Sequence, residues 1–275
     1  MASVDTAPLG PLNPGNVVSA ALRLYRDRFK TYMSLSARAA LWAFVPVYGW
    51  AKYFMLMGVM ARLAFQDLIN QPETTQQAHR QVNAKLWSFL VLGLLVGLIF
   101  VAAYLVLVIV GLILAFVFGG ILGGVLSVLL GSQIGAIVGA LLGFLVFVAI
   151  FLLGMVWLVS RLLIAEVPLA IESQIDVSDS IGRSWQLTKR SIMRIQFVVV
   201  AAFLITLPIL SVTSFAPQIA LVRLEPGSSA YWTLYAVIMV LGFLANIVIL
   251  PFWQTVKGVL YYDLRSRREG LDLKQ

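Results

Sequence analysis

Long uncharged stretches dominate the hydrophobic pattern of this chain. Between Leu86 and Ser160 there is no Asp, Glu, Lys, Arg or His. Because one helical crossing of a bilayer needs about 20 apolar residues, this stretch can hold at least two crossings. We expect two long helices within 86–165, joined by a glycine-rich turn at Gly119–Gly131.

Two further apolar stretches follow in the second half of the chain. Residues 195–215 predict a third crossing, kinked before Pro208. Residues 231–262 predict a fourth crossing, and the polar loop LVRLEPGSSA separates these two. The pattern therefore predicts four transmembrane helices.

A shorter apolar stretch, residues 34–70, is interrupted at Pro46 and Gly49. Each of its arms has roughly fifteen to twenty residues, which is short for a crossing. The stretch predicts a hydrophobic hairpin that either re-enters the membrane from one side or makes two further crossings.

Two segments combine apolar and cationic side chains with the period of a helix. They are residues 16–33, with Asn16 as the expected N-cap, and residues 176–194, capped by Asp176. The pattern is typical of helices that lie in a membrane interface. We expect the second helix to continue into the crossing at 195–215. Its expected apolar face consists of Val177, Ile181, Trp185, Thr188 and Ile192.

Composition supports the same class of protein. Of the 275 residues 61% are hydrophobic and 12% are charged, whereas soluble domains are about a quarter charged. We expect one all-α integral membrane domain over 1–275, with a polar tail at 1–15 and a basic tail at 263–275.

The residue inventory leaves little room for catalysis. The chain has no cysteine and a single histidine, His79, in a polar loop, so thiolate metal sites are excluded and histidine chemistry is disfavoured. We identify no candidate catalytic, cofactor-binding or metal-binding residues and expect no cofactor. A net charge of +8 without a soluble basic domain indicates anionic lipid rather than nucleic acid as the partner.

The cations predict the orientation. They crowd the N-terminal helix, the 161–194 segment and the C-terminus, whereas the loop before residue 231 has one arginine offset by a glutamate. By the positive-inside rule both termini are cytoplasmic. Tyr261 and Tyr262 are expected as interfacial rings at the end of the last crossing. The cations expected to meet anionic headgroups are Arg23, Arg26, Lys30, Arg183, Arg190, Arg194, Arg265, Arg267 and Arg268.

Two sets of residues inside the apolar stretches are candidates for association or transport. Gly131, Gly135, Gly139 and Gly143 recur every four residues, which allows another helix to approach closely. That helix belongs either to the same chain or to a second copy in a homo-oligomer. Asn246 and Gln254 lie about two turns apart, and they either face one interior groove or serve helix packing.

Three stretches resemble a bacterial membrane family named after the membrane domain of glycerophosphoryl diester phosphodiesterase. They are PLNPGNVVSAALRLYRDRF, GRSWQLTKRSIMRI and ILPFWQTVKGVLYYDLRSRREGLDL. The resemblance implies a non-catalytic multi-helix module of an inner membrane, without a settled function.

The function we expect is non-enzymatic. The chain is interpreted as a structural or scaffolding protein of the cell inner membrane or an internal membrane. We expect it to self-associate, to organise or shape the membrane through its amphipathic helices, and to meet anionic lipid or a protein partner on its cytoplasmic face. The alternative is a carrier or channel for a lipid or small amphiphile, and a lipid-modifying enzyme is the third interpretation.

Overall fold

The computed structural model describes residues 12–269, in which helices are the only regular secondary structure. Four helical segments of this part of the chain are long and apolar enough to cross a membrane: Leu86–Leu130, Ser132–Ile171, Ile192–Leu221 and Ser229–Glu269. The predicted class, an all-α integral membrane protein with four such helices, is confirmed. The tails expected at 1–15 and 263–275 lie partly outside the described residues.

The chain folds as two compact units. The first comprises residues 1–93 and 163–275, and the second comprises residues 94–162.

The first unit begins with two helices where the sequence predicted one over 16–33. Helix α1 spans Pro14–Asp27 and α2 spans Phe29–Trp42. The N-cap is Asn13 rather than Asn16, because Pro14 at the first helical position already suits a helix start. The helix is interrupted at Arg28, whose guanidinium pairs with Asp67 at 2.8 Å and donates to the carbonyl of Glu73.

Helices α2 and α3 (Tyr48–Leu68) form the hairpin expected within 34–70. Its tip is tight. A Cβ on Gly49 would lie 2.1 Å from the Trp42 carbonyl oxygen, so only glycine allows this approach. Val47 takes a φ of 60°, a strained conformation for a β-branched residue. Neither arm is among the four candidate crossings.

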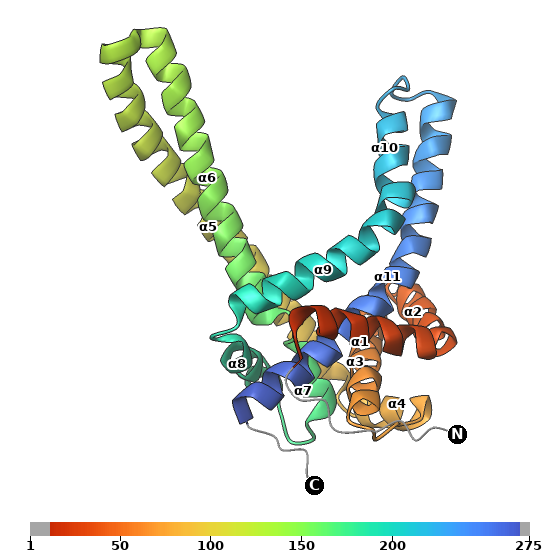
Figure 1. Ribbon diagram of the computed structural model, residues 1–275. Coiled ribbons are helices and arrows are strands. Elements are labelled where there is room, and N and C mark those ends of the chain that lie inside the picture. Colours follow the sequence, from red (N-terminus) through yellow and green to blue (C-terminus); the bar gives the residue numbers. More distant parts are fainter. Residues whose placement is uncertain (1–11, 270–275) are drawn as a thin grey trace. The chain divides into compact units, whose positions relative to one another are not determined.

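The two parts of helix α11 (Ser229–Glu269; Figure 1) differ in how far their side chains are buried. Before Pro251 it is mostly exposed, but from Pro251 to Leu264 nearly every side chain is buried. The second part packs on α1 and α3, and Gly258 lies against Ala61 and Ala64. The expected crossing at 231–262 therefore includes a stretch covered by the protein, and the expected tail from 263 is helical as far as Glu269.

Shorter helices complete the first unit. Their bounds are Thr75–Asn83 for α4, Glu166–Ile171 for α7, Val177–Thr188 for α8, Ile192–Leu210 for α9, Ser211–Phe215 for the π-helix η1, and Ala216–Leu221 for α10. Figure 1 shows α9 and α10 meeting at a bend. The bend falls at η1, just after Pro208, which lies inside α9 and lacks the N–H that a regular helix needs.

Helix α8 differs from the expected amphipathic helix over 176–194. Asp176 caps it as expected, accepting from the Asp179 backbone N–H at 2.8 Å, but it ends at Thr188 and does not continue into α9. Its buried residues are Ser180, Ser184, Leu187 and Thr188, whereas Trp185 is exposed. The small Ser180 side chain is buried because its hydroxyl donates to the Ala165 carbonyl and accepts from the Leu169 N–H.

The second unit is an antiparallel helical hairpin made of α5 (Leu86–Leu130) from Leu94 onward and α6 (Ser132–Leu162). The turn is Gly131 alone, with a φ of +92°, so the longer turn expected at Gly119–Gly131 is wrong. Residues 119–130 continue α5, because their glycines allow contact with α6 without breaking the helix. A Cβ on Gly139 would lie 2.4 Å from the Gly123 Cα.

Gly139→Leu should separate α5 from α6, because the added side chain would meet backbone atoms of α5. We expect a loss of about 1–3 kcal/mol, the usual cost of overpacking, measured as a lower midpoint of thermal unfolding in detergent. Gly120→Leu is the matched control, since nothing lies within 4 Å of a Cβ there. Equal midpoints for the two variants would contradict the helix contact.

Candidate membrane interface

A buried carboxylate anchors the end of α11. Asp263 is fully buried, and its oxygens pair with Arg194 at 2.8 Å and with Arg267 at 3.1 Å. It also accepts from the Leu12 backbone N–H at 2.8 Å. A buried charge is stable only when it is paired and hydrogen-bonded. This cluster therefore connects Leu12, α9 and α11.

A second cluster centres on Glu172. Its carboxylate pairs with Arg183 at 3.3 Å and accepts a hydrogen bond from the Tyr261 hydroxyl. Arg183 also pairs with Glu269, which pairs with Arg265 at 2.9 Å. Burial disfavours the charged form of Arg183, but Glu172 and Glu269 outweigh that effect and raise its pKa. The cluster therefore links α8 to the end of α11.

Three more cations are held inside the first unit. Lys257 pairs with Glu166 at 2.8 Å, and Arg62 makes a two-point contact with Glu73. Lys85 donates to carbonyls at the end of α7, 2.6 Å from that of Glu172, where a cation is favoured by the helix dipole. Burial and the nearby Arg62 lower the pKa of Lys85, although Glu172 acts in the opposite direction.

The ion pairs separate the nine cations that were expected to meet lipid into a paired group and an unpaired group. Arg183, Arg194, Arg265 and Arg267 each pair with a carboxylate of the protein, so they primarily hold the fold. Arg265–Glu269 and Arg267–Asp263 have the i,i+4 spacing that a helical sequence can reveal. The partners of Arg183 and Arg194 lie 11 to 86 positions away and could not be found from sequence. The other five of the nine expected cations are exposed and form no ion pair within residues 12–269: Arg23, Arg26, Lys30, Arg190 and Arg268.

Two adjoining grooves lie at the junction of α1 and α2. The first holds about 530 Å³ and combines the apolar side chains of Leu22, Tyr25 and Phe29 with Arg23 and Arg26. The second holds about 690 Å³. Its lining includes the cations Arg26, Arg28 and Lys30 and the carboxylates of Asp27 and Glu73. Arg26 and Phe29 line both grooves, so the apolar hollow continues into one with three cations and two carboxylates. No groups of three or more acidic or histidine side chains that could hold a metal occur among the described residues.

The expected groove at Asn246 and Gln254 does not form. Asn246 is exposed, whereas the Gln254 side chain is buried, 1% exposed, with its carbonyl oxygen lacking a partner among the described residues. Eight residues along a helix turn the side-chain direction by about 80°, so the two amides point different ways. The two tyrosines expected at the interface, Tyr261 and Tyr262, are also buried, and both rings pack near Phe65.

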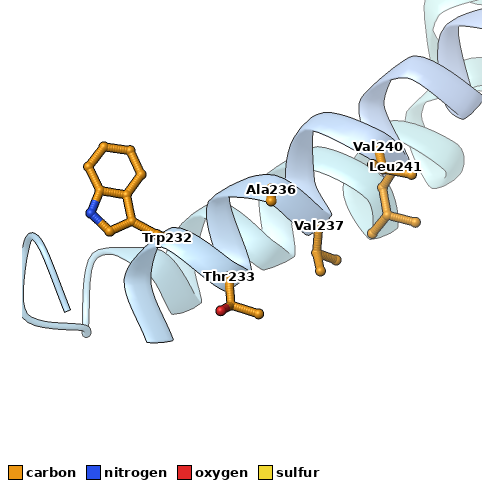
Figure 2. A pocket seen from close by; sticks show the side chains of 6 residues that line it. All are labelled: Trp232, Thr233, Ala236, Val237, Val240 and Leu241. Atoms are coloured by element: carbon orange, nitrogen blue, oxygen red, sulfur yellow. The ribbon is translucent and has the colours of Figure 1, made fainter. Parts of the chain in front are cut away.

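A different hollow lies on the exposed half of α11. Figure 2 shows its lining side chains projecting from one helix: Trp232, Thr233, Ala236, Val237, Val240 and Leu241. The only side-chain hydroxyl there, that of Thr233, donates to the Ser229 carbonyl of its own helix. The hollow suits acyl chains but presents no converging polar groups for a headgroup, which disfavours the carrier interpretation at this place.

The glycine series lies inside the α5–α6 hairpin. Gly135, Gly139 and Gly143 are buried, and their nearest neighbours are Ser127, Gly123 and Ala115 of α5. Gly131 makes the turn. The structure therefore places this face against the same chain, and it is not available to a second copy.

The tip of the α2–α3 hairpin exposes apolar side chains that sequence reasoning did not single out. They are Leu41, Phe44, Val45 and Val47. Aromatic rings flank them, with Trp42 against Tyr48 at 5.6 Å and Tyr48 near Trp87 at 6.5 Å. Lys52 lies over the Tyr48 ring and donates to Asn83. The aliphatic run around Pro46 is the only sequence signal of this tip.

No family model, curated protein or solved structure matches this chain. The resemblance seen in the three sequence stretches is thus neither supported nor contradicted.

Asp263→Asn should destabilise the first unit, because it removes the buried charge that pairs with Arg194 and Arg267. Breaking a buried ion pair from one side costs roughly 3 kcal/mol or more. The thermal unfolding midpoint in detergent should fall well below that of the control Glu225→Gln, which changes an exposed glutamate in the loop before α11. A midpoint equal to that of the control would show that the cluster contributes no stability.

Proposed function

We propose that the chain is a non-enzymatic structural protein of a bacterial inner membrane or an internal membrane, and that it binds anionic phospholipid on its cytoplasmic side. The observation that carries this proposal is the pair of adjoining grooves at the α1–α2 junction. An apolar hollow beside Leu22 and Phe29 opens next to Arg26 and Lys30, which fits the two ends of a lipid molecule.

The surrounding surface supports the same ligand. Leu22 of α1 and Phe29 of α2 are exposed beside exposed Arg23 and Arg26, so the surface at the α1–α2 junction combines apolar and cationic groups. Helices with this pattern lie at the boundary of headgroups and acyl chains, where each cation near an anionic leaflet contributes about 1 kcal/mol. The opposite face of α1 packs on α9 and α11, which fixes this surface to the membrane-crossing helices.

The proposal does not depend on a homo-oligomer. Gly135, Gly139 and Gly143 already contact α5, so self-association would require another surface. The proposed arrangement places both termini and the basic face in the cytoplasm, in accordance with the positive-inside rule. A protein that holds anionic lipid on one side in this way would organise the membrane around it.

The double variant Arg26→Gln, Lys30→Gln should weaken binding of phosphatidylglycerol. Two cations at about 1 kcal/mol each correspond to roughly a 30-fold loss of affinity. Native mass spectrometry of the protein released from nanodiscs of mixed phosphatidylglycerol and phosphatidylcholine would count the retained anionic lipids.

Arg80→Gln is the control, because Arg80 is exposed on α4 but lines neither groove. The proposal expects this variant to retain phosphatidylglycerol like the unaltered chain. Equal retention by the double variant, or equal retention of phosphatidylcholine and phosphatidylglycerol by the unaltered chain, would refute the proposed lipid site.

A further inference from the structure

The exposed half of α11 provides a scale for depth in the membrane. Trp232 and Trp253 stand twenty-one residues apart on this helix, a rise of about 32 Å at 1.5 Å per residue. That distance matches the hydrocarbon thickness of a bilayer, about 30 Å, and tryptophans favour its two boundaries. The boundary at Trp253 also coincides with the start of the buried half of α11, at Pro251.

The tip of the α2–α3 hairpin contacts α11 halfway along this span. The rings of Phe44 and Phe243 are 5.7 Å apart between centroids. Phe243 lies ten residues from Trp253 and eleven from Trp232, or about 15 Å from either boundary. The contact therefore puts Phe44 near the middle of the bilayer.

The hairpin reaches this depth without crossing. Helix α2 has 14 residues, about 21 Å of helix, which is less than the hydrocarbon thickness. Its partner α3 is covered by the protein over most of its length, including Ala51, Met55 and Val59. The apolar surface that is left for lipid is concentrated at the tip.

The first half of the tip pairs its backbone groups within the turn. The N–H groups of Ala43, Phe44 and Val45 donate to the carbonyls of Ala39, Leu41 and Trp42, and Pro46 has no N–H to satisfy. The Trp50 indole N–H donates to the Ala43 carbonyl at 3.2 Å, closing the turn. The N–H groups of residues 47–50, at the uncapped start of α3, have no such partner among the described residues, so they add to the cost of placing this turn in hydrocarbon.

We propose that residues 41–50 form a wedge that enters the membrane from the cytoplasmic side and ends near the bilayer centre. The acyl chains of the cytoplasmic leaflet are the occupant of its exposed surface, formed by Leu41, Phe44, Val45 and Val47. Lys52 donates to Asn83 at the end of α4 and lies closer to the boundary that the wedge enters, where a snorkelling lysine is stable.

The wedge adds volume to one leaflet only. This deepens the proposed function, since it names the part of the protein that would bend or expand the membrane on one side. It rests on the same membrane orientation, but it does not depend on the headgroup site at Arg26 and Lys30.

Fluorescence quenching by nitroxide-bearing lipids tests how deeply residues 41–50 enter the membrane. The natural chain has no cysteine, so a single Phe44→Cys carries one environment-sensitive fluorophore in nanodiscs whose lipids bear a nitroxide either near the headgroup or deep on the acyl chain. We expect the deep nitroxide to quench this label at least twofold more strongly than the shallow one. Val45→Cys repeats the measurement in case the first variant disturbs the contact with Phe243.

Labels at two other positions set the limits of the scale. A label at Gln76→Cys, which is exposed on α4, should be quenched by neither nitroxide and by aqueous iodide instead. A label at Tyr235→Cys should report the far boundary of α11. Stronger quenching at residues 44 and 45 by the shallow nitroxide, or by aqueous iodide, would overturn the wedge. A failure of the phosphatidylglycerol retention experiment, with the depth result as expected, would refute only the headgroup site at Arg26 and Lys30.

Discussion

The central constraint on this protein is that charged groups are stable only where they are paired or reach water. The chain satisfies it by gathering its ionic side chains in one helical unit. Asp263 forms ion pairs with Arg194 and Arg267. Glu172 pairs with Arg183, and Glu166 pairs with Lys257. These pairs allow α11 to continue as one helix from an apolar, exposed half into a buried half that carries charges.

Much of the fold could be predicted from hydrophobic pattern alone. Four apolar helices follow from the uncharged stretches, because no other structure satisfies the backbone in lipid at that length. The hairpin interrupted at Pro46 and the cap at Asp176 were also visible, since both depend on local chemistry. Element boundaries were less accurate. The break at Arg28 depends on Asp67 and Glu73, which lie far away along the chain.

The roles of polar residues were hardest to predict. A cationic helix face looks the same whether its arginines meet lipid or carboxylates, so Arg194 and Arg26 could not be distinguished by sequence. Tyr261 and Tyr262 follow an apolar run, as interfacial rings do, but Phe65 and Glu172 cover them. Asn246 and Gln254 have the spacing of a shared face only approximately, and the actual rotation along α11 separates them.

In the proposed orientation the paired charges, α4 and both grooves lie on one side of the membrane, and the loop before α11 lies on the other. Site-specific thiol labelling tests this most directly, in intact and permeabilised cells that produce either Glu225→Cys or Arg80→Cys. A membrane-impermeant reagent should label residue 225 in intact cells and residue 80 only after permeabilisation. Labelling of both residues from the same side would contradict the orientation on which the lipid site and the wedge both depend.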